Sequence, residues 1–417
     1  MDDNAVSEMI ADPKTYADPV VYHQLFGKLR REAPVRWTEP VGFRPFWAVM
    51  SHQHIVEIER QPQYFINAPR TALRTTEQEQ QIREVTGSTQ AAHTLIQMDD
   101  PEHKTFRKLT QAWFMPPALR ALQDEMGKLA GTFVDRLEAF GAHCDFARDI
   151  AAWYPLHALM VILGVPEQDA ALMHRLTQQH FAASDPSVSH GEKVDAGAPT
   201  REVFAYFSEL TAKRRNDPRN DIVSLLADAE IDGEPISDFD RNSYYFLLAI
   251  AGHDTTSASI SGLLHALMDN PDQFDRLRAD RSLLDSAINE GIRWTSPVKH
   301  FFRTATTDYQ IAGQTIRAGD SIMLHYPSAN FDETVIEDPF TFKIDRVPNR
   351  HVAFGFGIHQ CLGQHLAKLE MKSLFTQILD RVDSIQPAGD PQWLETNFVG
   401  GLKSLPVQYT LKTPQPV

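Results

Sequence analysis

A cysteine that closes a glycine-rich loop constrains this chain more than any other feature. The loop covers residues 354–363, with the sequence Phe-Gly-Phe-Gly-Ile-His-Gln-Cys-Leu-Gly, and the apolar residues after it recur at helical spacing, at Leu366, Leu369 and Leu374. This pattern predicts that Cys361 lies at a helix N-terminus, where the helix dipole and the amide of Gly363 favour a thiolate. The inner glycines allow the backbone to lie flat against a large planar group. A buried free cysteine is the commoner explanation of an isolated cysteine, but it explains neither the glycines nor His359.

These features suit a cysteine that ligates haem iron, with Phe354 packed beside the sulfur and His359 near the propionates. The spacing Phe-x-x-Gly-x-His-x-Cys-x-Gly resembles the haem-binding loop of the cytochrome P450 superfamily. The resemblance implies a mainly α fold with small β-sheets (α+β), and haem b between a long central helix and the helix after Cys361, its axial ligand. A cysteine-nucleophile enzyme is the alternative, but it needs a histidine and an acid to converge on Cys361, and no second motif supports it.

The composition limits the possible partners and compartments. The 417 residues contain no linker, repeat or low-complexity tract, so we expect one domain over residues 1–417, with approximately the first 30 residues as an N-terminal extension. The two cysteines argue against a disulfide framework, and the N-terminus resembles no signal peptide, so we expect a cytoplasmic protein. A net charge of −15 and the lack of a long apolar run argue against nucleic acid and membrane partners.

A long helix is expected in the centre of the chain, from the capping residues Ser237 and Asp238 to Asn270-Pro271. At 1.5 Å per residue, a helix of roughly 30 residues would be about 45 Å long. Its middle, residues 251–256, reads Ala-Gly-His-Asp-Thr-Thr and is a poor helix former. A hydroxyl that bonds to a carbonyl one turn back can open a kink there, and Gly252 leaves room for a small ligand such as dioxygen.

This segment is similar to the oxygen-activation motif Ala-Gly-x-Asp/Glu-Thr of the superfamily. The resemblance implies that Gly252, Asp254 and Thr255 are catalytic: Thr255 hydrogen-bonds the dioxygen, and Asp254 relays protons from solvent. His253 is outside the motif. An exposed polar face of the helix is the structural alternative, but apolar residues flank the segment on both sides.

Two further sets of residues match the superfamily. Glu290 and Arg293 share a helix face and resemble its Glu-x-x-Arg element, which implies a buried structural pair completed by Arg346. The haem propionates need buried cationic or hydrogen-bonding groups. The resemblance implies that the propionates are bound by His103, Arg107, Arg303 and His359, and that Phe354 and Gly363 bind the cofactor at the sulfur. For each of the four propionate residues, an ordinary surface charge is the alternative.

The substrate pocket of the superfamily lies above the haem. By resemblance, the residues at its positions here are Leu95, Ile96, Ala251, Val298, Phe301, Phe302, Phe398 and Val399. They are mostly apolar, as in a pocket for a compact hydrophobic substrate; a core role is the alternative. Residues 297–301, 349–351 and 397–403 are similar to the bacterial branch that contains the α-terpineol hydroxylase, which implies a monoterpenoid or alkyl-aromatic substrate. Short strands are expected at residues 36–37, 46–49, 309–311, 314–316 and 321–324.

Electrons must come from another protein, because no Gly-x-Gly-x-x-Gly fingerprint follows a strand. The resemblance implies an iron–sulfur ferredoxin with its reductase, docked on the face nearest Cys361, for which Lys104, Lys108, Lys368 and Lys372 offer a partial basic patch. The chain is therefore interpreted as a haem-thiolate monooxygenase that uses dioxygen to hydroxylate its substrate. Two alternatives stay open: a peroxide-dependent peroxygenase, which has less need of Asp254 and Thr255, and a haem sensor without turnover.

Overall fold

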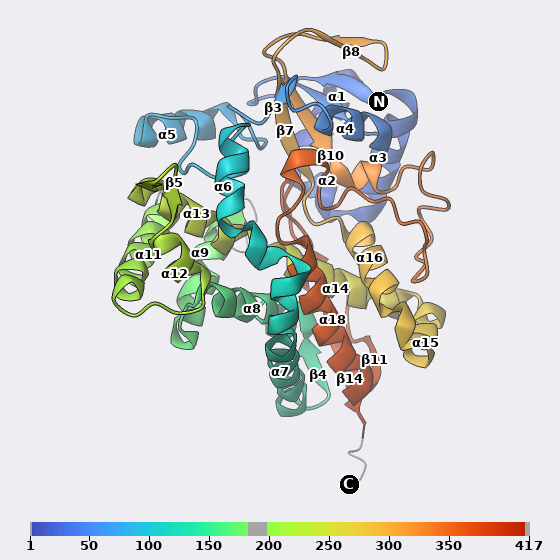
Figure 1. Ribbon diagram of the computed structural model, residues 1–417. Coiled ribbons are helices and arrows are strands. Elements are labelled where there is room, and N and C mark those ends of the chain that lie inside the picture. The colour runs from blue at the N-terminus through green and yellow to red at the C-terminus, as the bar shows by residue number, and fades with distance from the viewer. Residues whose placement is uncertain (1, 182–197, 413–417) are drawn as a thin grey trace.

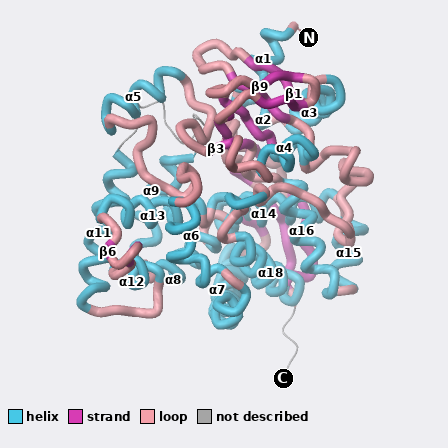
Figure 2. The backbone as a smooth tube through the Cα atoms, turned by 45° about the horizontal axis from the view of Figure 1, so that its top comes forward, coloured by secondary structure: helices cyan, strands magenta, loops and turns pink. Residues whose placement is uncertain are grey.

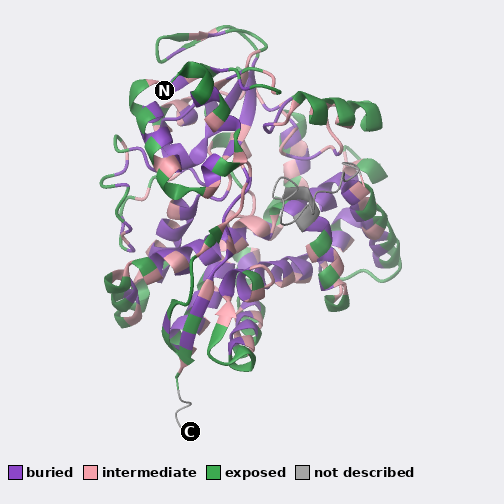
Figure 3. Cartoon of the chain, turned by 180° about the vertical axis from the view of Figure 1, so that it is seen from behind, coloured by how far each residue is buried: buried purple, intermediate pink, exposed green. Residues whose placement is uncertain are grey.

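The molecule combines a large helical part with a smaller part built on a β-sheet (Figure 1; Figure 2). The structure is a computed structural model that describes residues 2–181 and 198–412. Buried residues gather along the helices and strands at the centre, while exposed residues dominate peripheral elements such as α5, which has no buried residue (Figure 3). Within the described ranges, none of the helices combines the length and the apolar run that a bilayer crossing requires.

The sheet part holds one five-stranded sheet in the order β1-β2-β10-β7-β3. Only β2 and β10 pair in parallel. Helices α1 to α3 pack on this sheet through a cluster that includes Phe26, Phe46 and Phe302. The strands expected at residues 36–37, 46–49, 309–311, 314–316 and 321–324 are confirmed. The bounds are α1 Asp3–Ala11, α2 Pro13–Ala17, α3 Pro19–Glu32, β1 Val35–Thr38, β2 Phe46–Val49, α4 His52–Glu59, β3 Phe65–Ile66, β7 His300–Ala305, β8 Tyr309–Ile311, β9 Gln314–Ile316, β10 Ser321–His325 and α17 Tyr326–Ala329.

The helical part surrounds α14 and α18, whose buried faces share a core with α7 and α16. Its helices are α5 Thr76–Thr86, α6 Glu102–Gln111, α7 Pro116–Phe140, α8 Tyr154–Leu163, α9 Ala170–Phe181, α11 Ala198–Asn216, α12 Ile222–Ala227, α13 Asp238–Ala251, α14 Asp254–Asp269, α15 Pro271–Ala279, α16 Leu284–Thr295 and α18 Gln364–Arg381. The remaining strands are β4 His143–Asp145, β5 Glu230–Ile231, β6 Glu234–Pro235, β11 Val382–Pro387, β12 Gln392–Trp393, β13 Leu402–Ser404 and β14 Pro406–Leu411.

The expected central helix is present as two helices, α13 and α14, separated by Gly252 and His253. The expectation of one continuous helix was therefore wrong, although a kink had been predicted at this segment. The Thr255 hydroxyl donates to the carbonyl of Ala251 at 3.4 Å, a bond that competes with regular helix geometry. His253 departs from helical angles, with φ −124° and ψ −43°. The interruption leaves polar groups in the middle of a buried span.

Glu290 and Arg293 on α16 anchor the irregular segment that leads to the cysteine loop. Both side chains are fully buried, with Arg293 Nη2 2.8 Å from Glu290 Oε1, and Arg346 Nε lies 3.0 Å from Glu290 Oε2. Arg293 also donates to the carbonyls of Asn330 and Pro339. The prediction of a buried pair completed by Arg346 is confirmed. Because Asn330 in turn accepts the N–H of Val352 at 2.7 Å, this network fixes the start of the loop.

Candidate active site

The cysteine loop presents its sulfur at the N-terminus of α18. The loop is closed by the N–H of Cys361, which donates to the carbonyl of Phe354 at 2.8 Å. Helix α18 begins at Gln364, and the N–H groups of Gly363 and Gln364 both donate to the sulfur. Donors aimed at one sulfur stabilise its anionic form.

The thiol of Cys361 nevertheless has a raised pKa in the protein alone. Desolvation raises this pKa, and it outweighs the two N–H donors and the positive charge of Arg107, which lower it. The amide of Gly363 therefore favours a thiolate, as predicted, but the groups that lower this pKa do not together outweigh desolvation. A metal cation bound directly to the sulfur would stabilise the thiolate, since metal coordination deprotonates a thiol.

The two inner glycines of the loop serve different purposes. Both have left-handed backbone angles, with φ +68° at Gly355 and +71° at Gly357. Gly355 lines the cavity over the sulfur. A Cβ on Gly357 would lie 2.3 Å from the carbonyl oxygen of Glu59, so this glycine is required by the close approach of α4. Of the two glycines expected to face a planar group, only Gly355 lines the cavity.

A cavity connects the cysteine loop to the break between α13 and α14. Its lining contains every residue that the sequence analysis assigned to the cofactor, together with the sulfur: His103, Arg107, Arg303, Phe354, His359, Cys361 and Gly363. These residues come from α6, β7 and the cysteine loop. They are brought together only by the fold.

One end of this cavity is rich in cationic and donor groups. The rings of His103 and His359 lie 4.0 Å apart, and His359 Nε2 is buried without a hydrogen-bond partner among the described residues. The pKa of His359 is lowered to about 2, first by desolvation and then by Arg303, His103 and Arg107. Arg303 is itself paired with Glu59 at 2.8 Å. An unpartnered imidazole nitrogen near two guanidinium groups fits the carboxylates of a group such as haem, with the sulfur placed for its iron.

Gly252 and Thr255 line the same cavity from the break between α13 and α14. A Cβ on Gly252 would lie 2.8 Å from both the carbonyl oxygen of Leu248 and a methyl group of Leu159, so only glycine fits. The carboxylate of Asp254 is not part of the lining. It lies 3.0 Å from the Nε2 of buried His253.

The apolar wall of the cavity contains five of the eight expected pocket residues: Leu95, Ile96, Ala251, Val298 and Phe301. Phe302 does not line it. Successive side chains of a strand point to opposite faces, so Phe301 and Arg303 face the cavity while Phe302 packs against Phe46 at 5.3 Å. The assignment of Phe302 to the pocket is corrected accordingly.

Phe398 and Val399 are also absent from the lining and stand behind it. The Phe398 ring lies 5.6 Å from Phe301, and Val399 forms a β-bridge with Val298. They support pocket residues without reaching the cavity surface. Their assignment to the pocket is corrected too.

The structure adds lining residues that the sequence analysis missed. Leu247 and Leu248 lie one turn before Ala251, so helical spacing could have identified them. Asn67, just after β3, and Tyr326, at the start of α17, gave no local signal, because only the fold brings them here. Tyr326 donates its hydroxyl proton to Glu59 at 2.8 Å and thereby extends the network around Arg303.

Comparison with known proteins identifies the family to which this chain belongs. The family model described as Cytochrome P450 matches residues 200–412. The chain belongs to the cytochrome P450 family. The Cytochrome P450-terp of a Pseudomonas species is 40% identical, with 97% of each chain covered. The steroid C26-monooxygenase of Mycolicibacterium smegmatis is 34% identical over 92% of this chain and 89% of its own.

Solved cytochrome P450 structures share the whole fold. CYP108D1 from Novosphingobium aromaticivorans superposes with a TM-score of 0.92 at 42% identity, covering 98% of this chain and 99% of the other. CYP268A2 from Mycobacterium marinum gives a TM-score of 0.89 at 31% identity, with 95% and 97% covered. The chain is thus a cytochrome P450 monooxygenase, and its cofactor is haem b with Cys361 as the axial thiolate ligand.

Proposed function

We propose that this cytochrome P450 hydroxylates a small hydrophobic substrate, a monoterpenoid or an alkyl-aromatic compound, with dioxygen and with electrons from an iron–sulfur ferredoxin. The observation that carries the proposal is the apolar wall of Leu95, Ile96, Ala251, Val298 and Phe301 beside Thr255. Apolar and aromatic walls recognise ligands by shape. CYP268A2, a structural relative, was solved in complex with pseudoionone.

The residues around the cavity receive distinct roles in this proposal. Haem, when bound, supplies oxygen activation and receives electron density from the Cys361 thiolate. His103, Arg107, Arg303 and His359 would hold its propionates, and Phe354 would pack beside the sulfur, to which the Gly363 N–H donates. Gly252 keeps space open beside Thr255.

Thr255 and Asp254 supply the proton transfer. The bond from the Thr255 hydroxyl to Ala251 is 3.4 Å long and therefore weak, so the hydroxyl can turn to a ligand in the cavity. Asp254 lies outside the lining and can take protons from the side of the helix that faces away from the cavity. Replacement of Thr255 by Ala is expected to keep haem bound and to divert electrons from product to hydrogen peroxide. Full coupling in Thr255→Ala would refute the role of the hydroxyl.

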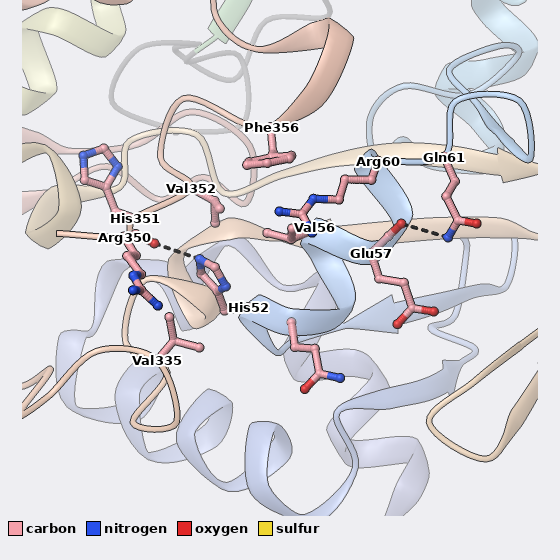
Figure 4. A pocket seen from close by; sticks show the side chains of 11 residues that line it. His52, Val56, Glu57, Arg60, Gln61, Val335, Arg350, His351, Val352 and Phe356 are labelled. Carbon is pink, nitrogen blue, oxygen red and sulfur yellow. Dashed lines mark hydrogen bonds between the residues drawn. The ribbon is translucent and has the colours of Figure 1, made fainter. Parts of the chain in front are cut away.

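A groove beside the cysteine loop supports the ferredoxin as the electron donor. It holds about 950 Å³ between α4 and residues 350–356 (Figure 4). The exposed Arg60 lies 5.0 Å above the ring of Phe356, five positions before Cys361, and exposed Arg350 lies on its other side. Lys104 and Lys108 are exposed, whereas Lys372 is paired with Asp285 and Lys368 lies over Phe354. The two exposed arginines beside the apolar side chains of the groove suit an acidic ferredoxin.

Electron delivery can be separated from substrate binding. We expect Arg60→Glu to raise the KM for ferredoxin several-fold and to weaken its dependence on salt, while the affinity for substrate is unchanged. Arg83→Glu is the matched control, because Arg83 is exposed on α5, away from the groove. Equal effects of the two substitutions would mean that net charge, and not this groove, governs docking.

Two measurements test the proposed function as a whole. The carbon monoxide complex of the reduced protein should give a Soret band far to the red of a histidine-ligated haem, and Cys361→His should abolish that shift. Turnover with ferredoxin, reductase and labelled dioxygen should then place one labelled oxygen atom in a monoterpene alcohol or an alkylbenzene. Exclusive turnover of a sterol would refute the small substrate, product formed with peroxide alone would favour a peroxygenase, and a lack of any product would favour a sensor.

A further inference from the structure

His253 is buried beside the proposed proton relay but has no part in it so far. Its side chain is fully buried in the break between α13 and α14. Its Nε2 lies 3.0 Å from Asp254 Oδ1 and 3.1 Å from Thr177 Oγ1, which belongs to α9. Its Nδ1 has no hydrogen-bond partner among the residues that the structure describes. One imidazole nitrogen thus connects the proposed catalytic acid to a separate helix.

The partners of His253 determine where its ring proton lies. The Thr177 hydroxyl has backbone carbonyl acceptors at 2.9 Å (Met173) and 3.1 Å (His174), so its proton is already used. The Thr177 oxygen must therefore accept a hydrogen bond from His253 Nε2. An ionised Asp254 is also only an acceptor. Both contacts require the proton on Nε2.

We propose that His253 is a positioning residue: its Nε2–H, itself anchored by Thr177 on α9, holds the Asp254 carboxylate on the α9 side of the helix break. The inference rests on the proposed relay through Asp254 and Thr255 and adds to it the residue that orients the acid. Without this bond, the Asp254 carboxylate loses the partner that the described residues offer it on that side. Proton delivery then becomes slower than the release of partly reduced oxygen.

The test compares substitutions that keep or remove a donor at the position of Nε2. His253→Gln retains an N–H donor at that place, whereas His253→Leu removes it at similar volume. We expect His253→Leu to lower the ratio of product to reduced nicotinamide roughly tenfold, as for loss of a hydrogen bond to a charged group, and His253→Gln to restore most of it. Thr177→Val should act in the same direction by a smaller factor. Thr211→Val is the matched control, because buried Thr211 on α11 bonds to Tyr245 instead.

A spectroscopic readout separates positioning from general damage. In protein with ¹⁵N-labelled histidine, in the reduced carbon monoxide form, the His253 ring should appear as the Nε2–H tautomer, and Thr177→Val should weaken this preference. A ring protonated on Nδ1, or wild-type coupling in His253→Leu, would overturn the inference. If the wild-type enzyme itself failed to couple dioxygen to product, the proposed function would fail first, and the tautomer measurement would still decide the geometry.

Discussion

Acid should destabilise this protein through His300, a buried histidine on β7. Its side chain is fully buried, and both ring nitrogens are occupied. Nε2 accepts the N–H of Leu73 at 2.9 Å, and Nδ1 lies 2.9 Å from the carbonyl oxygen of Asn397. An amide N–H can only donate and a carbonyl can only accept, so the folded protein holds a neutral ring with its proton on Nδ1. Protonation of Nε2 would set two donors against each other.

The magnitude follows from the displaced pKa. Burial lowers the pKa of His300 from 6.5 to about 3; the bond to Asn397 opposes this, and the charge of Arg70 adds to it. As the pH falls below 6.5, the unfolded chain binds this proton while the folded protein does not. The contribution of neutral His300 to the free energy of unfolding is therefore complete above pH 6.5 and is lost as the pH drops toward 3. The slope is at most about 1.4 kcal/mol per pH unit. Over the whole window the loss is on the order of 5 kcal/mol.

Urea unfolding between pH 7 and pH 4 measures this contribution directly. The free energy of unfolding of the wild type should fall more steeply with acid than that of His300→Gln. Below about pH 6, the two slopes should differ by close to the value for one proton, about 1.4 kcal/mol per pH unit. Other histidines, such as the partly buried His23 and His351, have pKa values lowered to about 4 and act in the same window. The difference between wild type and variant isolates His300, and His143→Gln, at an exposed position on β4, is the control. Identical slopes for wild type and His300→Gln would refute the neutral-ring argument.

Two further substitutions test how the site is held. Glu290→Gln leaves the buried guanidinium groups of Arg293 and Arg346 without their counter-charge, so we expect thermal unfolding to show a loss of about 3–5 kcal/mol in the free energy of unfolding. The control, Glu209→Gln in the exposed pair with Lys213, should lose less than about 1 kcal/mol. Similar losses in the two variants would mean that the buried triad is not stabilising. Gly357→Ala places a methyl group 2.3 Å from the Glu59 carbonyl, whereas a Cβ on Gly355, which has a similar φ, meets nothing closer than 3.7 Å. We therefore expect faster haem loss from Gly357→Ala than from Gly355→Ala, measured by transfer to apomyoglobin, and equal rates would show that backbone strain alone matters.

Local spacing in the sequence was enough to predict the chemical groups of the site. The cysteine loop, the helix break and the Glu290–Arg293 pair each lie within ten residues of chain. Over so short a stretch, the local backbone geometry determines where successive side chains point. Which face of β7 meets the cavity depends instead on its register with β10 and β3. For that reason, Phe301 could not be distinguished from Phe302 by local spacing alone. The same holds for Phe398, which packs on Phe301 from almost a hundred residues away.

Glu59 shows why the supporting residues escaped the sequence analysis. It ends α4, a short helix in which a glutamate resembles an ordinary surface charge, yet it is almost completely buried. One carboxylate oxygen accepts both Arg303 and Tyr326 at 2.8 Å, and its backbone carbonyl lies against Gly357. Desolvation raises the pKa of this carboxyl group, and Arg303 is the main influence that opposes it. A single residue therefore couples the cationic end of the cavity to the cysteine loop, through contacts that span more than two hundred positions and that no local pattern encodes.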